Sequence, residues 1–474
     1  MITLQIEIDK ENFNNFDNFL MELKEKLLNT GREIIREALE SRDNEIMRSR
    51  DKKRFRSKGK RKTCLKTWFG AVEYERQVYA DLDNPDDKYY VYLLDEEIKP
   101  HEVGYVSKDV CKMAAQAVVN SSYRAAAQEI TEMTGLSISP QGVWNIIQQI
   151  GKKQREKIET YSEQAQKHQL TGAVESKIVY EENDGIWLKL QGQSRKDYGA
   201  SREMKVGIAY DGATWKIGKG KKKRRTLDNK VAYAAFESSA DFRKNKEGLL
   251  ASRFIVDEIE LRVINGDGAQ WIQKRPGVKC ISVLDKFHRN KKITECVKDG
   301  TTAKTIRKLL YSGQIQEMMD YIEAMINSVE DPHELSGLKE LRMYYSNNLG
   351  ALTDPYSRGI EIPETIHPGV VHYARLGSME SNVFTLVGNR MKGRRATWSI
   401  NGANNLSAIL CAYHISGMES LFQTACNFYQ PEPQFDLYGL SAAKIPQRVG
   451  HGYEPEHMVS IAQAPWLNKL NIVF

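Results

Sequence analysis

The order of apolar segments between residues 176 and 284 constrains the fold of this chain more than any other feature. Three predicted strands, 176–192 with alternating polarity, 204–212 and 230–237, follow one another with short connections, which favours antiparallel pairing. A helix with an apolar seam then leads to two further strands, 259–266 and 278–284. Because a helix separates these two strands, we expect them to be parallel. The pattern predicts an α/β fold.

Helical periodicity dominates the chain before residue 172. Apolar residues recur at steps of three and four in 12–47, which predicts one long helix. The segment 64–80 is typical of a β-hairpin that turns at Gly70, and 107–166 is helical again. From about 289 to 350 the chain is expected to be helical once more.

A helix-turn-helix outline lies within 121–151. One helix is expected to end near Met133, Gly135 to break it, and Ser139 and Pro140 to start a second helix as N-cap and first residue. Such a pair can place its second helix in the major groove of DNA, although an ordinary helical hairpin has the same pattern.

Three basic clusters make a nucleic acid the favoured partner. The net charge is only +7, but ten Lys and Arg residues gather in 48–62, and further clusters lie at 219–225 and 390–395. Clusters of this kind neutralise phosphates and release counterions, although a solvated surface is the alternative for any one of them. No apolar run approaches about 18 residues, so we expect no membrane span.

The remaining bulk features favour a cytoplasmic protein. The first residues show neither the basic nor the apolar part of a secretory signal. Six cysteines are scattered without a CxxC pair, which indicates free thiols rather than a zinc site or a disulfide framework.

Two aspartates are candidates for metal-binding carboxylates. Asp184 lies in the middle of a strand of alternating polarity, where burying an unpaired carboxylate is energetically unfavourable and a functional role would account for it. The alternative is a turn, because "NDG" is also a turn signal. Asp267 ends the fourth strand, and ligands of open α/β sheets bind at such ends. Asp211 ends the second strand and is a rival for the first position. We prefer Asp184, because an antiparallel second strand takes Asp211 to the edge opposite Asp267.

Three further residues complete the candidate site. Asp285 ends the fifth strand, at the same edge as Asp267, and His288 follows it in "DKFH". A helix cap beside a satisfied histidine has the same spacing. Glu380 falls in the first turn of a helix that starts near Ser378, where the helix dipole favours a carboxylate, as it would in any helix.

Six motifs in this order carry a resemblance to a known family. They are "LKTWFGAVEYERQVY", "SYRAAAQEITEMTGLSISPQGVWN", "ENDGIWLKLQG", "GDGAQWI", "LDKFHRNKKI" and "GSMESNVFTLVGNRMKGRRATWSINGANNL". The chain resembles DDE transposases of bacterial insertion sequences within the Mutator-like superfamily, most closely their ISLre-type branch. The resemblance covers at least residues 60–420.

The resemblance implies a fold and its parts. It implies an RNase H-like catalytic core, with a mixed five-stranded sheet and helices, an all-α insertion, and a mainly helical N-terminal DNA-binding region. The expected parts are an N-terminal helix, basic segment and hairpin (1–105), a helix-turn-helix-like region (106–170), the first part of the core (171–289), the helical insertion (290–365), the last part of the core (366–430) and a tail (431–474).

The resemblance also implies the site and its chemistry. The catalytic and metal-binding residues correspond to Asp184, Asp267 and Glu380, and a family motif of Cys or Asp followed by His corresponds to Asp285 and His288. Glu181, Glu182 and Asp211 remain alternatives for the first position. Two Mg²⁺ ions, or Mn²⁺ as a substitute, would support cleavage at the element's end and joining of the 3′-OH to target DNA.

Double-stranded DNA, both element ends and target, is therefore the expected partner of a cytoplasmic, nucleoid-associated dimer or higher oligomer. The expected DNA contacts are Arg54, Arg56, Lys60, Arg61, Lys62, Arg124, Gln141, Lys221, Lys222, Arg390, Arg394 and Arg395. A nuclease with the same core, and a DNA-binding regulator or domesticated inactive transposase, are the alternatives.

Overall fold

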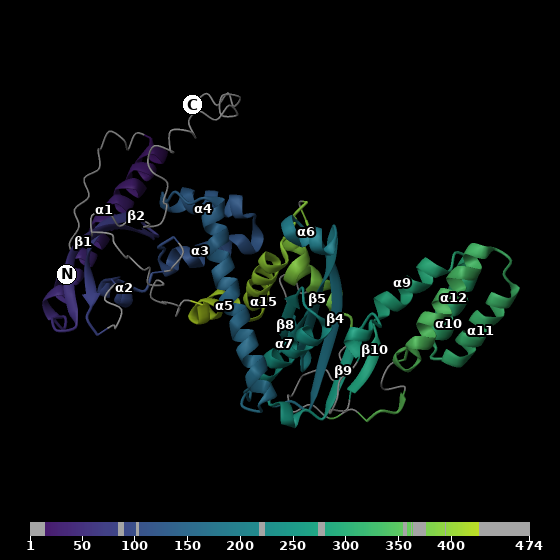
Figure 1. The fold of residues 1–474 in the computed structure, drawn as a ribbon. Helices are drawn as coiled ribbons and strands as arrows, with labels where there is room; N and C mark the ends of the chain where they lie inside the picture. The colour runs from purple at the N-terminus through teal and green to yellow at the C-terminus, as the bar shows by residue number, and fades with distance from the viewer. Residues whose placement is uncertain are drawn as a thin grey trace. The chain divides into compact units, whose positions relative to one another are not determined.

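The computed structural model describes residues 15–83, 90–100, 104–217, 223–273, 280–353, 358–361, 363, 376–393 and 395–425. The chain divides into two compact units (Figure 1). Unit 1 comprises Met1–Ile150 and Met418–Phe474, and unit 2 comprises Gly151–Gly417. Among the described helices, none is long and apolar enough to cross a membrane.

Unit 1 begins with a long helix and a hairpin. Helix α1 (Phe16–Ser49) confirms the predicted N-terminal helix. Strands β1 (Phe55–Thr67) and β2 (Gly70–Asp81) form the predicted hairpin, and the short β3 (Tyr90–Val91) pairs with β2. The hairpin is longer than its apolar pattern indicated, because β1 begins at Phe55 and includes most of the basic cluster. Gly70 follows the turn with a φ of 104°, a conformation that favours glycine.

The remaining helices of unit 1 match the predicted outline. Helices α2 (Leu93–Ile98), α3 (Lys108–Asn120) and α4 (Tyr123–Thr134) precede α5 (Pro140–Gln166), within which unit 1 ends. Gly135 ends α4 in a left-handed conformation, with a φ of 70°. The Ser139 hydroxyl accepts a hydrogen bond from the Gly142 amide at 3.0 Å, which stabilises the start of α5. The predicted helix end at Gly135 and the predicted N-cap at Ser139 are therefore confirmed.

Unit 2 is built on a mixed sheet of five strands. The strands are β4 (Ile178–Lys189), β5 (Ser201–Tyr210), β8 (Val231–Ala235), β9 (Leu261–Gly266) and β10 (Cys280–Leu284). They lie in the order β10-β9-β4-β5-β8, so that β4 is central. Strand β5 is antiparallel to β4 and β8, whereas β9 is parallel to β4 and β10. The predicted α/β fold and strand directions are confirmed.

One expectation for the sheet is confirmed and one detail differs. Residues 183–185 continue β4 without a turn, paired with residues 205–207 of β5, so Asp184 lies in the middle of a strand as predicted. A second hairpin, β6 (Gly212–Ile217) and β7 (Lys223–Asp228), stands between β5 and β8, where we expected only a basic loop. Polar strand residues such as those of β7 give no apolar alternation, so the pattern could not identify this hairpin.

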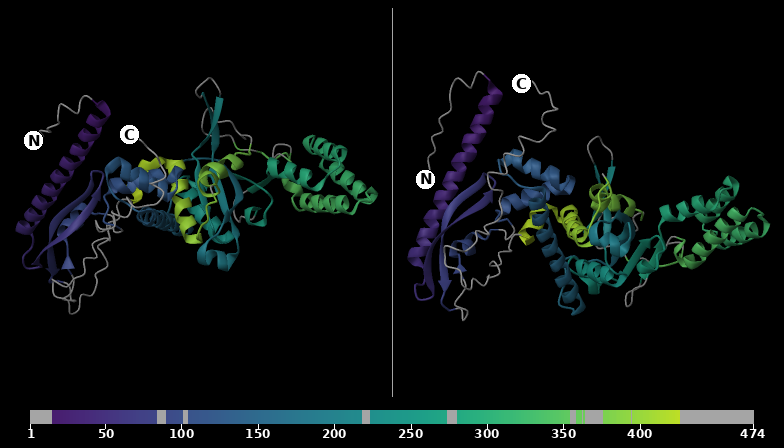
Figure 2. Two further views of the ribbon diagram at one scale, coloured as in Figure 1. Left: turned by 90° about the horizontal axis from the view of Figure 1, so that it is seen from above. Right: turned by 45° about the horizontal axis from the view of Figure 1, so that its top comes forward.

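Helices flank and extend the sheet of unit 2. Helices α6 (Gly192–Tyr198), α7 (Ser239–Ala251) and α8 (Gln270–Gln273) and the 3₁₀ turn η2 (Val256–Glu258) connect the strands. After β10 come α9 (Lys286–Cys296), α10 (Gly300–Tyr311), α11 (Ile315–Ser328), α12 (Pro332–Asn347) and η3 (Leu349–Ala351). Figure 2 shows α10, α11 and α12 side by side, where they enclose an apolar core with Ile306, Ile322, Leu338 and Leu341.

The last described part of unit 2 returns to the sheet. Helix α13 (Met379–Val383), the π-helical turn η5 (Phe384–Gly388) and α14 (Asn389–Met391) form one helical run, which confirms the helix expected near Ser378. A Cβ on Gly388 would lie 3.4 Å from the Ile186 side chain, so this run packs on the central strand β4. Helix α15 (Ile400–Ala425) follows and is interrupted at Gly417.

Candidate active site

The central strand β4 places Asp184 in a pocket of unit 2. Residues of β4 alternate between the two faces of the sheet, so Asp184 shares a face with Glu182 and Ile186. Its Oδ1 accepts the Gly185 amide at 2.7 Å. Burial raises the pKa of the Asp184 carboxyl, and the nearby carboxylates of Asp267 and Glu380 raise it further. Negative charge is therefore concentrated at this point of the sheet.

Asp267 follows the last residue of β9, which runs parallel to β4. Its Oδ1 accepts the Ala269 amide at 2.9 Å, and its carbonyl oxygen accepts the Tyr344 hydroxyl at 2.7 Å. Gly268 has a φ of 93°, and a Cβ there would come within 2.8 Å of the Asn348 side chain. The turn that carries Asp267 is thus tied to the end of α12 and depends on a glycine.

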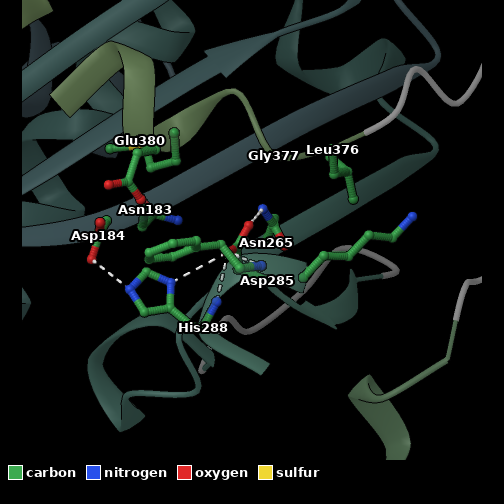
Figure 3. Close-up of a pocket in the computed structure, with 11 residues that line it drawn as sticks. Asn183, Asp184, Asn265, Asp285, His288, Leu376, Gly377 and Glu380 are labelled. Carbon is green, nitrogen blue, oxygen red and sulfur yellow. Dashed lines mark hydrogen bonds and ion pairs between the residues drawn. The ribbon is translucent and has the colours of Figure 1, made fainter. Parts of the chain in front are cut away.

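Glu380 reaches the same pocket from a distant part of the chain. It lies in the first turn of α13 and is exposed. The pocket is lined by side chains from four segments: Asn183, Asp184, Asn265, Asp285, Lys286, Phe287, His288, Leu376, Gly377, Met379 and Glu380. Figure 3 shows Asp184 and Glu380 at one end of this pocket, and their carboxylates interact electrostatically.

Asp285 and His288 form a connected pair beside Asp184. Asp285 is the N-cap of α9, where its Oδ1 accepts the amides of Phe287 at 2.9 Å and His288 at 3.2 Å. The His288 ring lies between two carboxylates: its Nδ1 is 3.3 Å from Asp285 Oδ1, and its Nε2 is 3.9 Å from Asp184 Oδ1 (Figure 3). The hydrogen bond to Asp285 raises the pKa of His288. Burial opposes ionisation of Asp285, but bonds from His288 and Asn265 lower its pKa overall.

The alternatives for the first carboxylate lie elsewhere. Glu181 points to the opposite face of β4, where it pairs with Lys246 at 2.7 Å. Asp211 is buried beyond the end of β5, and its Oδ2 accepts from Asn229 at 2.8 Å. Tyr210 pairs with Tyr180 near the start of β4, so Asp211 lies at the end of the sheet away from Asp267, as the antiparallel direction required.

Glu182 is the alternative closest to Asp184, but its carboxylate is directed at neighbouring donors. It is fully buried and accepts hydrogen bonds from the Tyr210 hydroxyl, the Asn265 side chain and two backbone amides. Asn265 donates also to Asp285, at 3.1 Å. Sequence analysis missed Asn265, and its position two residues before Asp267 in an apolar strand is the signal that could have identified it.

The donor set is suited to a hard divalent cation. Asp184, Asp267 and Glu380 offer only carboxylate oxygens, the ligands that Mg²⁺ prefers, and their mutual repulsion would be relieved by a cation. Among the described residues, no group of three or more Asp, Glu, His or Cys side chains is already close enough together to hold a metal ion. The chemistry of these residue types fits Mg²⁺.

Several predicted DNA contacts lie in unit 1. Arg56, Lys60, Lys62, Arg124 and Gln141 are exposed, and Arg61 is half-buried. Arg54 is exposed as well, but its guanidinium is already paired within the protein, because it donates to both carboxylate oxygens of Asp81, at 3.0 and 2.9 Å. Gln141 donates to Asn145 at 2.9 Å. Much of the cluster from 54 to 62 is thus presented by a β-strand.

The other predicted contacts lie in unit 2 or outside the described residues. The Arg390 guanidinium stacks on the Trp398 ring at 5.5 Å, and Arg395 is exposed. Neither of these two residues lines the pocket. Lys221, Lys222 and Arg394 lie outside the described residues.

Comparisons with known proteins give a family. The chain is 26% identical to UPF0236 protein TTE2489 of Caldanaerobacter subterraneus subsp. tengcongensis over 341 residues. This match covers 70% of the chain and 67% of the relative. A second relative from that organism is 27% identical over 346 residues, 71% of this chain and 68% of its own, and its name joins eleven TTE designations. Residues 9–421 match the family described as "Uncharacterised protein family (UPF0236)", and the chain therefore belongs to this family.

Proposed function

We propose that this protein is a Mg²⁺-dependent DNA transposase of the DDE type. The observation that carries the proposal is that Asp184 of β4 and Glu380 of α13 line one pocket of unit 2, while Asp267, which is not among the lining residues, directly follows the neighbouring parallel strand β9. Carboxylates at a pocket have little use in DNA binding alone, because they repel phosphates. Its use in a DNA-processing protein is to hold cations.

The sheet supports an RNase H-like core as the scaffold of this site. Three antiparallel strands are followed by two strands parallel to the first, and helices α9 to α12 separate the last strand from α13. This is the arrangement that the resemblance to DDE transposases implies, with a helical insertion before the last acidic residue. Asp267 follows the carboxyl end of β9, where α/β sheets bind their ligands, and the pairing of Glu182 with Asn265 puts Asp184, in the middle of β4, level with it.

Asp184, Asp267 and Glu380 are the residues that would hold Mg²⁺, with Mn²⁺ as a possible substitute. When bound, the cations supply an activated water for DNA cleavage and neutralise charge on the phosphate during cleavage and joining. His288 faces Asp184 through Nε2 and is held by Asp285 through Nδ1. His288 is therefore placed to hold or release a proton beside the reacting phosphate.

The basic residues supply the contacts to DNA in this proposal. Lys60 and Lys62 on β1, together with Arg124 and Gln141 of the helix-turn-helix, bind the element ends. Arg395 of unit 2 also contacts phosphates, and the 219–225 cluster contacts the target. Cutting two ends together requires a dimer or higher oligomer on the DNA.

The relatives add independent support. A name that joins eleven designations from one organism fits a coding sequence present in many copies, as mobile elements are. Another relative's name joins four such designations.

The test is a reaction on labelled DNA that carries the element's own end, with Mg²⁺ or with EDTA. We expect Mg²⁺-dependent nicking at the end and joining to a second DNA for the wild type, and neither for Asp267→Ala. Glu260→Gln is the matched control, since Glu260 is exposed and lies just before β9 whereas Asp267 lies just after it. Cutting without joining would favour a nuclease. Tight binding without cutting under any metal would reject the transposase in favour of a DNA-binding regulator.

A further inference from the structure

The buried Glu182 carboxylate binds the segment that leads into α13. Its Oε2 accepts the backbone amides of Gly377 at 2.9 Å and Ser378 at 3.1 Å. Gly377 and Ser378 are far from Glu182 in sequence, and they directly precede the helix that carries Glu380. One side chain of the central strand thus joins the start of α13 to the sheet.

The remaining acceptor positions of Glu182 are occupied by donors from the neighbouring strands. The Tyr210 hydroxyl of β5 donates to Oε1 at 2.8 Å, and Asn265 of β9 donates to Oε2 at 3.0 Å. A fully buried carboxylate is costly unless donors surround it, and here they come from both neighbouring strands and from the backbone before α13. Because both oxygens are engaged, Glu182 is suited to holding protein groups in place.

A second contact fixes the same helix start from its other side. The Asn382 side chain donates to the Ser378 carbonyl at 2.8 Å, and its Oδ1 accepts from Lys230 Nζ at 3.0 Å. Ser378 is therefore bound through its amide by Glu182 and through its carbonyl by Asn382. Glu380 follows within the same helical turn, so its backbone position is determined by these contacts.

We propose that Glu182 is a positioning residue that sets Glu380 against Asp184. Glu182 and Asp184 are two residues apart on one face of β4, so the strand that presents one catalytic carboxylate also anchors the helix that presents another. The inference rests on the proposed function for what the assembled site does. The anchoring itself concerns only the contacts between β4 and the start of α13.

Glu182→Gln tests the anchoring directly. The variant keeps the size of the side chain but removes its charge and one acceptor oxygen, so the single remaining oxygen cannot accept from the Gly377 and Ser378 amides while the other position accepts from the Tyr210 hydroxyl. We expect hydrogen exchange of these two amides to be at least tenfold faster than in the wild type, measured relative to Val206 and Ile208 of β5. The matched control is Glu181→Gln, which alters the adjacent buried carboxylate on the opposite face and should leave the ratio unchanged.

An unchanged exchange ratio in Glu182→Gln, or an equal increase in Glu181→Gln, overturns the anchoring. Should Glu182→Gln fail to fold, Glu182→Asp keeps the charge and shortens the reach by one methylene. It is expected to speed the same two amides, and unchanged exchange in this folded variant overturns the inference as well.

A double-mutant cycle links the anchoring to the site. We expect Glu182→Gln to weaken Mn²⁺ binding about tenfold by titration calorimetry, and to have no further effect in a Glu380→Gln background. Equal weakening in both backgrounds rejects positioning of Glu380. If the wild type binds no Mn²⁺ and cuts no DNA, the proposed function fails, whereas the exchange result still decides whether Glu182 anchors α13.

Discussion

The Nε2 atom of His288 lies 3.9 Å from Oδ1 of Asp184, so the third residue of α9 meets the middle of the central strand β4. The other ring nitrogen lies 3.3 Å from Asp285. One imidazole therefore connects the N-cap of α9 with the pocket, and its pKa is raised by the bond to Asp285 and by the charge of Asp184. Asp285 thus acts on the site through His288.

Conservative changes of the three carboxylates should separate catalysis from DNA binding. We expect Asp184→Asn, Asp267→Asn and Glu380→Gln each to reduce end cleavage more than about a thousandfold, because each removes one of the carboxylates proposed to hold the cations. Binding to the element end, measured by gel shift in EDTA, should stay within about twofold of the wild type. Cleavage near wild-type rates in any one variant would remove that residue from the site.

Divalent cations should stabilise the fold through the same carboxylates. A ligand at 100 times its Kd contributes about 2.7 kcal/mol to stability. We therefore expect Mg²⁺ to raise the melting temperature of the wild type by several degrees in calorimetry, and to have little effect on Asp184→Asn or Glu380→Gln. An equal increase in the wild type and both variants would show that Mg²⁺ acts elsewhere.

Asp285 should contribute separately to the stability of the fold and to the rate of DNA cleavage. Asp285→Ala removes the N-cap of α9 and is expected to cost about 1 kcal/mol of unfolding free energy in urea, whereas Asp285→Asn keeps a capping oxygen and should cost less than about half of that. Both variants lose the charged partner of His288, so we expect about 10- to 100-fold slower cleavage in each. If Asp285→Asn cleaves DNA at the wild-type rate, Asp285 acts only as the N-cap of α9 and its charge is not needed beside His288.

The exposed lysines of β1 should contribute to DNA affinity through charge. For each phosphate contact removed by Lys60→Gln or Lys62→Gln, the slope of log K against log salt concentration should fall by about 0.9. Lys304→Gln on α10 serves as the control, because Lys304 is also exposed but lies outside the basic clusters. Slopes that do not differ between the β1 variants and this control would argue against the hairpin as a DNA contact.

The sequence by itself determined the local structure of this protein. Period-two alternation identified β4, and the separating helix correctly made β9 and β10 parallel. Ser139 and Gly135 marked the ends of α5 and α4, because capping and left-handed backbone need particular residues. The position of Asp211 at the end of the sheet away from Asp267 also followed from strand direction alone.

Only the tertiary structure decided what the neighbouring polar residues do. Alternation puts Glu182 and Asp184 on one face but cannot show that donors from β5, β9 and the Gly377 segment surround only Glu182. Spacing alone could not distinguish a helix cap at Asp285 from a functional pair of Asp285 and His288. In the structure Asp285 caps α9 and also contacts His288, whose other ring nitrogen faces Asp184. The physical reason is that the hydrogen-bond partners of a buried carboxylate come from segments far apart in the sequence. Whether these segments contact one another depends on the packing of the whole unit, and the local sequence pattern does not encode it.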